Sequence, residues 1–302
     1  MRVAAVDIGT NSTRVLVADV ADDGAFTVRE RRTVITGLGR GVDATGEISA
    51  EGMARTIAVL EEYGAIIRRS AVAAVRAVAT SASRDAANRD EFVRRAVAAL
   101  GTAPEVIPGE EEAALTFRGA TGGLAADLPV LVIDPGGGST EFVLGRTSPE
   151  YSISVDIGSV RLTERHLTER PATPEQVETA AQAARSLIAM VRLPEAPATV
   201  VGVGGTVTSL AAIALDLPAY VREEVHGSVL TADDIAGLVD SLAALSLPEL
   251  EAIPSLDPAR APVILGGAVV VSEALRRAGS ERLVVSDHGV LLGVALALAA
   301  RA

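Results

Sequence analysis

The chain contains neither cysteine nor lysine, and these two absences exclude whole classes of chemistry. Without cysteine there is no disulfide bond, no zinc site built on thiolates and no cysteine nucleophile. Without lysine there is no Walker A phosphate-binding lysine and no Schiff base. All 27 basic residues are arginine, whose planar guanidinium group suits paired hydrogen bonds to phosphate oxygens.

The chain also lacks a stretch that is apolar enough to cross a membrane. Its longest uncharged run, residues 196–215, is interrupted by one proline, three glycines and four hydroxyl residues. The first residues lead directly into a strand, without the basic and apolar regions of a secretory signal. We therefore expect a cytoplasmic protein that has no membrane partner.

Acidic residues outnumber basic ones, which gives a formal net charge of −12. Binding to nucleic acids or to acidic membranes needs an extended basic surface, so we expect no nucleic acid as a partner. The chain has 302 residues, of which 49% are hydrophobic. It can bury a large core and is long enough for two domains.

The most informative stretch is residues 130–144, where an apolar strand runs into Asp134, a glycine-rich turn and a returning strand. In such a hairpin tip several backbone N–H groups can converge on one anion, and hydroxyl groups add further donors. Two carboxylates, Asp134 and Glu141, flank the tip. They would repel phosphate unless a hard cation such as Mg²⁺ lay between. The residues of the tip are Gly136, Gly137, Gly138, Ser139 and Thr140.

A second copy of this pattern opens the chain at residues 3–17. Asp7 again ends an apolar strand, and it precedes Asp134 by 127 positions, about the length of one domain. A third glycine element follows an apolar strand at residues 200–206, where the start of a helix can meet a phosphate or a nucleoside. The repeated hairpin predicts two similar lobes that hold a ligand between them.

At these residues the sequence resembles the Ppx/GppA phosphatase family, which contains exopolyphosphatases and guanosine pentaphosphate phosphatases. The resemblance covers nearly the whole chain, and the matching segments follow the order found in the family. It implies an α/β fold made of two similar lobes of the actin, Hsp70 and sugar-kinase type, each ribonuclease H-like, with a cleft between them. The matching segments are residues 7–12, 83–88, 109–113, 134–141, 158–164, 204–206 and 225–227.

We expect the first lobe to comprise residues 1–120 and the second lobe residues 121–302. The boundary is predicted in a connection rich in small residues, 119–129. The final helix, which follows Asp287, is assigned to the second lobe, with packing back onto the first lobe as the alternative.

The resemblance also implies roles for individual residues. Glu112, directly before Ala113, is expected to be the general base that activates water. Taken alone, it would be an acidic residue in a first helical turn, and Arg84 would be a solvated helix residue. Asp134 and Glu141 are expected to hold Mg²⁺ or Mn²⁺, with help from Asp7. The residues expected to bind phosphate are Thr10, Asn11, Ser12, Arg84, Gly136, Gly137, Gly138, Ser139, Thr140, Gly205 and Thr206.

The activity implied is that of a Mg²⁺-dependent exopolyphosphatase, which releases orthophosphate from the ends of polyphosphate, and we expect short chains and a homodimer. Two alternatives remain open. One is removal of the terminal phosphate of guanosine pentaphosphate. The other is a nucleotide-binding regulator without catalysis, against which Glu112 speaks because binding alone needs no water-activating carboxylate.

The loop at residues 37–41 contains three glycines and one arginine. Two interpretations of it remain open. It either folds over a bound phosphate or serves as a plain flexible connection.

Overall fold

The computed structural model describes residues 1–21, 24–122 and 124–300, and the chain forms two compact units. Unit 1 contains Met1–Gly119 together with helix α13 (Val290–Ala299), and unit 2 contains Ala120–Gly289. The boundary predicted after residue 120 lies next to this division, although Gly123 of the predicted connection lies outside the described residues. The last helix is part of unit 1 rather than of unit 2. The cleft expected between the lobes stays a prediction.

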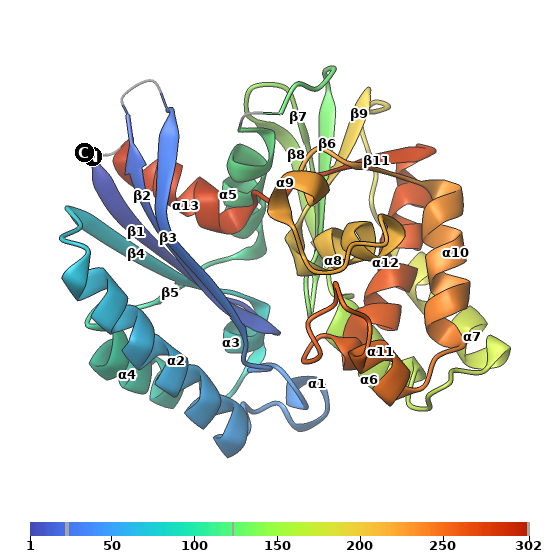
Figure 1. The fold of residues 1–302 in the computed structure, drawn as a ribbon, viewed down its shortest axis with the longest axis horizontal. Helices are drawn as coiled ribbons and strands as arrows, with labels where there is room; N and C mark the ends of the chain where they lie inside the picture. The colour runs from blue at the N-terminus through green and yellow to red at the C-terminus, as the bar shows by residue number, and fades with distance from the viewer. Residues whose placement is uncertain (22–23, 123, 301–302) are drawn as a thin grey trace. The chain divides into compact units, whose positions relative to one another are not determined.

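Unit 1 is built on a five-stranded mixed sheet with the order β3-β2-β1-β4-β5 (Figure 1). β1 pairs antiparallel with β2 and parallel with β4, which in turn pairs parallel with β5. The carboxyl ends of the three parallel strands therefore share one edge, where the predicted site residues of unit 1 follow them. The strands are β1 (Arg2–Ile8), β2 (Ser12–Val20), β3 (Phe26–Ile35), β4 (Ala74–Ala79) and β5 (Glu105–Val106).

Helices cover both faces of this sheet. Alternation along β1 sends Val6 toward one face, where it packs with residues of α2 and α4, and Ala5 toward the other, where it packs with α13 (Figure 1). α13 approaches α5 closely, since a methyl group added to Gly293 would lie 1.8 Å from the Leu115 carbonyl oxygen. The other helices of this unit are α1 (Val42–Thr45), α2 (Ala50–Arg69), α3 (Ser81–Asp85), α4 (Arg89–Leu100) and α5 (Gly109–Thr121).

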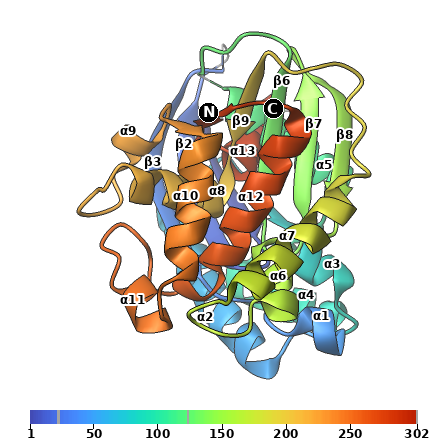
Figure 2. The same ribbon diagram turned by 90° about the vertical axis from the view of Figure 1, so that its right-hand side faces the viewer.

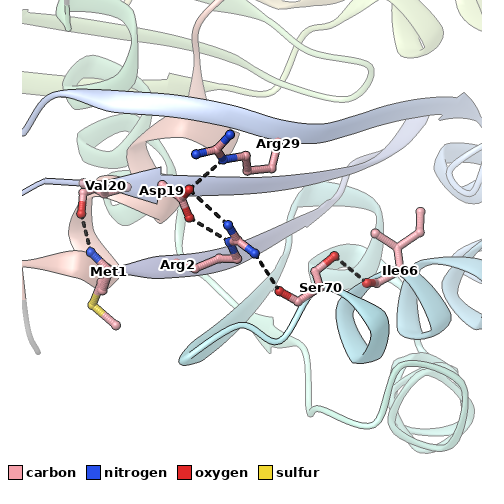
Figure 3. Close-up of polar contacts among 7 residues, drawn as sticks. All are labelled: Met1, Arg2, Asp19, Val20, Arg29, Ile66 and Ser70. Carbon is pink, nitrogen blue, oxygen red and sulfur yellow. Dashed lines mark hydrogen bonds and ion pairs between the residues drawn. The ribbon is translucent and has the colours of Figure 1, made fainter.

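The far ends of these strands are tied by a polar cluster around Asp19 (Figure 3). Arg2 donates two hydrogen bonds to the Asp19 carboxylate, at 2.7 and 3.1 Å, and Arg29 donates another at 2.6 Å. Arg2 also reaches the Ser70 carbonyl at the end of α2, and the Met1 ammonium group donates to the Val20 carbonyl. The cluster joins β1, β2, β3 and the end of α2.

We expect Asp19→Asn to lower the Tm at pH 7 by a small amount, because exposed ion pairs stabilise weakly. Hydrogen bonds from Arg2 and then Arg29 hold the pKa of Asp19 well below its usual 3.8. A carboxylate with a lowered pKa stabilises the fold above its ordinary pKa, and this stabilisation is lost as the pH falls through the lowered value. Thermal unfolding from neutral pH into the acid range should show the Tm difference shrinking below pH 3.8. A difference that stays constant would contradict this role.

Unit 2 repeats the plan with the sheet order β10-β11-β9-β6-β7-β8 (Figure 1). β6 pairs antiparallel with β7 and parallel with β9, as β1 does with β2 and β4, and β9 pairs parallel with β11. The prediction of an α/β fold with two similar lobes is thus confirmed. The strands are β6 (Val130–Pro135), β7 (Thr140–Gly145), β8 (Pro149–Val155), β9 (Thr199–Gly202), β10 (Val229–Thr231) and β11 (Arg282–Val285).

The helices of unit 2 enclose its hydrophobic core against the sheet, with α7, α10 and α12 side by side (Figure 2). The 3-10 turn η1 (Ala261–Val263) directly precedes α12 (Ile264–Ala278). The other helices are α6 (Ser159–His166), α7 (Pro174–Ile188), α8 (Gly204–Ala214), α9 (Arg222–Val225), α10 (Ala232–Ala243) and α11 (Leu247–Glu251). In the part of the chain that the structure describes, no helix combines the length and the apolar character needed to cross a membrane.

Candidate active site

The first hairpin turns between β1 and β2 at residues 9–12, which we call the first tip. The Gly9 N–H donates to the Ser12 carbonyl at 2.9 Å, and a methyl group on Gly9 would lie only 3.0 Å from that oxygen. Asp7 stands directly across from Arg14, whose guanidinium group lies 3.6 Å from the carboxylate and donates to the Ser12 hydroxyl at 3.1 Å. The charge of Asp7 is therefore balanced within the hairpin.

The second hairpin is built in the same way at residues 136–139, the second tip. The Gly136 N–H donates to the Ser139 carbonyl at 2.9 Å, and the methyl-to-oxygen distance is again 3.0 Å. Here, however, Asp134 stands across from Glu141, which occupies the position that corresponds to Arg14. Glu141 is buried and accepts a hydrogen bond from the Ser154 hydroxyl at 2.7 Å. Two carboxylates on neighbouring strands repel each other, so this hairpin favours a cation.

The start of α6 fixes the second tip. Its Ser159 N–H donates to the Gly136 carbonyl and its Val160 N–H to the Gly137 carbonyl, both at 2.9 Å. The backbone of α6 comes so close that a methyl group on Gly158 would lie 2.5 Å from the Gly137 carbonyl. The packing of α6 against the tip thus requires glycine at position 158.

Buried polar side chains gather at the first tip and at the start of α3. The Thr10 and Ser81 hydroxyls are 2.7 Å apart, which ties the ends of β1 and β4 together. The side chains of Asn11 and Ser83 are only 7% and 1% exposed, yet the described residues offer no hydrogen-bond partner to the Asn11 amide or the Ser83 hydroxyl. Buried polar groups without partners destabilise a fold, so both fit a site that a polar ligand fills. Ser83 begins the segment 83–88 that matches the family, but it is not among the predicted site residues.

Arg84 and Glu112 come together in unit 1. The Arg84 guanidinium group donates to the Ile107 carbonyl at 2.9 Å and to the Glu112 carboxylate at 3.4 Å. Glu112 is 13% exposed, so its carboxylate is mostly shielded but still reachable. Its neighbour Glu111 instead accepts a hydrogen bond from Arg76 at 2.6 Å. The guanidinium group of Arg76 is buried and also donates to Glu105. Glu112 is therefore distinct from Glu111 in its surroundings.

The third glycine element lies at the start of α8 in unit 2. Gly204 has a φ of +83°, and a methyl group there would lie 2.5 Å from the Asp134 carboxylate. A methyl group on Gly205 would lie 2.3 Å from the Arg260 guanidinium group, so bare backbone lies against both a carboxylate and an arginine. Thr206 is buried and packs on Gly267 of α12, and its predicted contact with phosphate stays a prediction. Arg260 is not among the residues that the sequence predicts to bind phosphate or metal.

The carboxylate pair Asp134 and Glu141 fits a hard cation. Mg²⁺ is commonly held by one or two carboxylates, while water and substrate phosphates fill its other positions. Within residues 1–21, 24–122 and 124–300, no three Asp, Glu or His side chains gather in the manner of an all-protein metal cage. Asp7 belongs to the other unit and lies beside Arg14, so its share in binding metal stays a prediction.

Comparison with known proteins gives consistent results. The family model described as "Ppx/GppA phosphatase family" matches residues 16–302. Exopolyphosphatase 2 of Mycobacterium tuberculosis is 44% identical over 317 residues, which cover 99% of this chain and 98% of that protein.

Solved structures agree with this result. A protein described as exopolyphosphatase-like has a TM-score of 0.94 at 36% identity, over 98% of this chain and 97% of its own. The Aquifex aeolicus member of the Ppx/GppA family has a TM-score of 0.84 at 35% identity, over 100% of this chain and 98% of its own.

Proposed function

We propose, from the premise that the chain belongs to the Ppx/GppA phosphatase family, that it is a Mg²⁺-dependent exopolyphosphatase that acts on short polyphosphates. The family and the identity to an exopolyphosphatase make the chain a phosphoanhydride hydrolase. The observation that carries the proposed hydrolysis is the placement of Glu112, whose carboxylate lies 3.4 Å from the Arg84 guanidinium group near the carboxyl edge of the unit 1 sheet.

In the proposed reaction water attacks the terminal phosphorus directly. Glu112 accepts a proton from the water as the new oxygen–phosphorus bond forms and the bridging bond to the rest of the chain breaks. The products are orthophosphate and a polyphosphate shorter by one unit. The absence of cysteine agrees with direct attack by water. Arg84 contacts the Glu112 carboxylate at 3.4 Å and would help to orient it toward the water.

The phosphates are proposed to bind at the two tips. In unit 1 the candidates are Thr10, Asn11, Ser12 and Arg84. In unit 2 they are the amides and hydroxyls of residues 136–140, with Gly205 and Thr206 at the start of α8. Asp134 and Glu141 would hold Mg²⁺, with Asp7 as a further candidate, and the cation would supply neutralisation of the negative charge on the phosphates.

The preference for short chains follows from the charge of the protein. At a net charge of −12, phosphates beyond the site meet repulsion, so each additional unit should contribute little affinity. We also propose that the enzyme acts in the cytoplasm as a homodimer, in which a second copy extends the binding surface.

We expect kcat/KM to level off within short polyphosphates, and intermediates to accumulate because the chain is released between cuts. The measurement is phosphate release from polyphosphates of defined length, at equal concentration of chain ends and at fixed ionic strength. Phosphate release from guanosine pentaphosphate is measured under the same conditions. Values that keep rising into chains of hundreds of phosphates would overturn the short-chain proposal. Faster turnover of guanosine pentaphosphate than of polyphosphate would favour the alternative of a guanosine pentaphosphate phosphatase. If the protein turned over none of these substrates, the alternative of a regulator without catalysis would be favoured.

A further inference from the structure

The loop that contains three glycines, residues 37–41, is fastened to the first tip. The Gly37 N–H donates to the Asn11 carbonyl at 2.9 Å, and the Gly39 N–H donates to the Thr10 carbonyl at 2.8 Å. Leu38 between them is completely buried in the core of unit 1. The backbone of the loop is therefore bonded to the tip, unlike a plain flexible connection, while contact of the loop with a phosphate stays a prediction.

These two hydrogen bonds determine where the amides of the first tip point. In a trans peptide the C=O of one residue and the N–H of the next point in opposite directions. Because the Thr10 and Asn11 carbonyls face the loop, the N–H groups of Asn11 and Ser12 face away from it. In the turns and loops that the structure describes, no backbone carbonyl accepts a hydrogen bond from the Asn11 N–H. The loop thus holds the Thr10 and Asn11 carbonyl oxygens, which would repel an anion, away from the site. It leaves the Asn11 and Ser12 N–H groups on the opposite side, where they can donate to an anion.

The second tip shows the same arrangement with a different partner. There the first turn of α6 binds the Gly136 and Gly137 carbonyls, which turns the N–H groups of Gly137 and Gly138 the other way. Gly137 corresponds to Thr10 in the repeat of 127 positions. In the first tip the loop binds the Thr10 carbonyl, and in the second tip α6 binds the equivalent Gly137 carbonyl. In both tips the N–H group of the following residue is thereby turned away from the element that binds the carbonyl.

We propose that the loop of residues 37–41 is a positioning element for the phosphate site of unit 1, acting through the Asn11 and Ser12 amides. The inference rests on the proposed function, since it concerns how that site holds a substrate phosphate. It assigns Gly39 a role in substrate affinity although its own atoms need not touch the substrate.

The loop is held firmly enough for this task. A methyl group on Gly39 would lie 2.3 Å from Thr10 Cγ2 and 3.0 Å from Ala82 Cβ, so only glycine fits between the tip and α3. On the other side, Arg55 of α2 donates to the Thr36 carbonyl at 3.0 Å. Any side chain at position 39 must push the loop away from Thr10 and release its carbonyl.

The experiment compares Gly39→Ala with a matched control in the same unit. Gly64→Ala places a methyl group 2.7 Å from the Ala99 carbonyl, between α2 and α4, and so causes a similar clash away from the tip. We expect Gly39→Ala to raise KM for a short polyphosphate about 10–100-fold, as for the loss of one hydrogen bond to a charged group, with a much smaller change in kcat. Gly64→Ala should lower the Tm and leave KM unchanged.

A second substitution tests the mechanism through rescue. Thr10→Ser removes the Cγ2 methyl group that blocks a side chain at position 39 but keeps the hydroxyl that pairs with Ser81. The double variant with Gly39→Ala should recover most of the lost affinity, so the two changes should be strongly non-additive in a double-mutant cycle. Circular dichroism confirms that each variant is folded.

The outcomes separate this inference from the proposed function. A wild-type KM in folded Gly39→Ala, or an equal rise of KM in Gly64→Ala, would overturn the role of the loop while the exopolyphosphatase activity stood. A wild-type protein that releases no phosphate from polyphosphate would overturn the proposed function. Inhibition of the wild type by inorganic phosphate, weakened in Gly39→Ala, would support the loop independently of turnover chemistry.

Discussion

Glu112→Gln is expected to lower kcat by about 10²–10⁴-fold, the range for the loss of a general base. The amide keeps the shape of the side chain and can still contact Arg84, so polyphosphate should bind with a similar KM. The measurement is steady-state phosphate release by wild type and variant, at the same pH and Mg²⁺ concentration. Loss of rate without loss of affinity would separate a chemical role of Glu112 from a structural one.

The matched control is Glu111→Gln, one position earlier in the same helix. Glu111 is bonded to Arg76, which retains Glu105 as a second partner, so this variant should show a modest loss of stability and nearly normal kcat. Wild-type turnover in Glu112→Gln would remove Glu112 from the reaction. An equal loss in both variants would mean that α5 as a whole, rather than one carboxylate, is needed.

Removal of divalent metal is expected to lower the rate by about 10²–10³-fold or more, since neutralising phosphate charge contributes several kcal/mol to the barrier. Treatment with EDTA followed by addition of Mg²⁺ or Mn²⁺ should abolish and then restore activity. Asp134→Asn and Glu141→Gln should each raise the metal concentration needed for half-maximal rate by at least about tenfold. The physical reason is that each variant replaces one of two facing carboxylates by a neutral amide.

Glu195→Gln provides the control for these metal titrations, because Glu195 is an exposed carboxylate of unit 2 that is paired with Arg146. It should leave the metal dependence unchanged. Full activity of the wild type after exhaustive chelation would exclude the metal from the reaction. A normal metal dependence in both Asp134→Asn and Glu141→Gln would instead show that the cation binds elsewhere.

The sequence was most informative where local pattern decides the structure. Apolar runs that end at Asp7 and Asp134 predicted both hairpins, which the chain forms as β1–β2 and β6–β7. The family motifs predicted Arg84 and Glu112 as site residues, and the fold brings these two side chains into contact. Such features depend on a few consecutive residues or on their order along the chain.

What escaped prediction depends on contacts between distant segments. Whether Gly37 and Gly39 bind the tip depends on how the chain turns after β3, which glycine-rich sequence leaves open. The missing partner of the Ser83 hydroxyl appears only when the surrounding side chains are in place. Arg14 did have a signal, since an alignment of the two repeats sets it against Glu141 and shows that these two equivalent positions carry opposite charges.

The position of α13 in unit 1 bears on the order in which the protein can fold during synthesis. Val3, Ala5 and Leu16 pack with residues of α13, so the core of the N-terminal unit needs residues near the end of the chain. Unit 2 needs only Ala120–Gly289. The part of the unit 1 sheet that α13 covers therefore stays exposed until Val290–Ala299 has been synthesised, which happens only after all of unit 2.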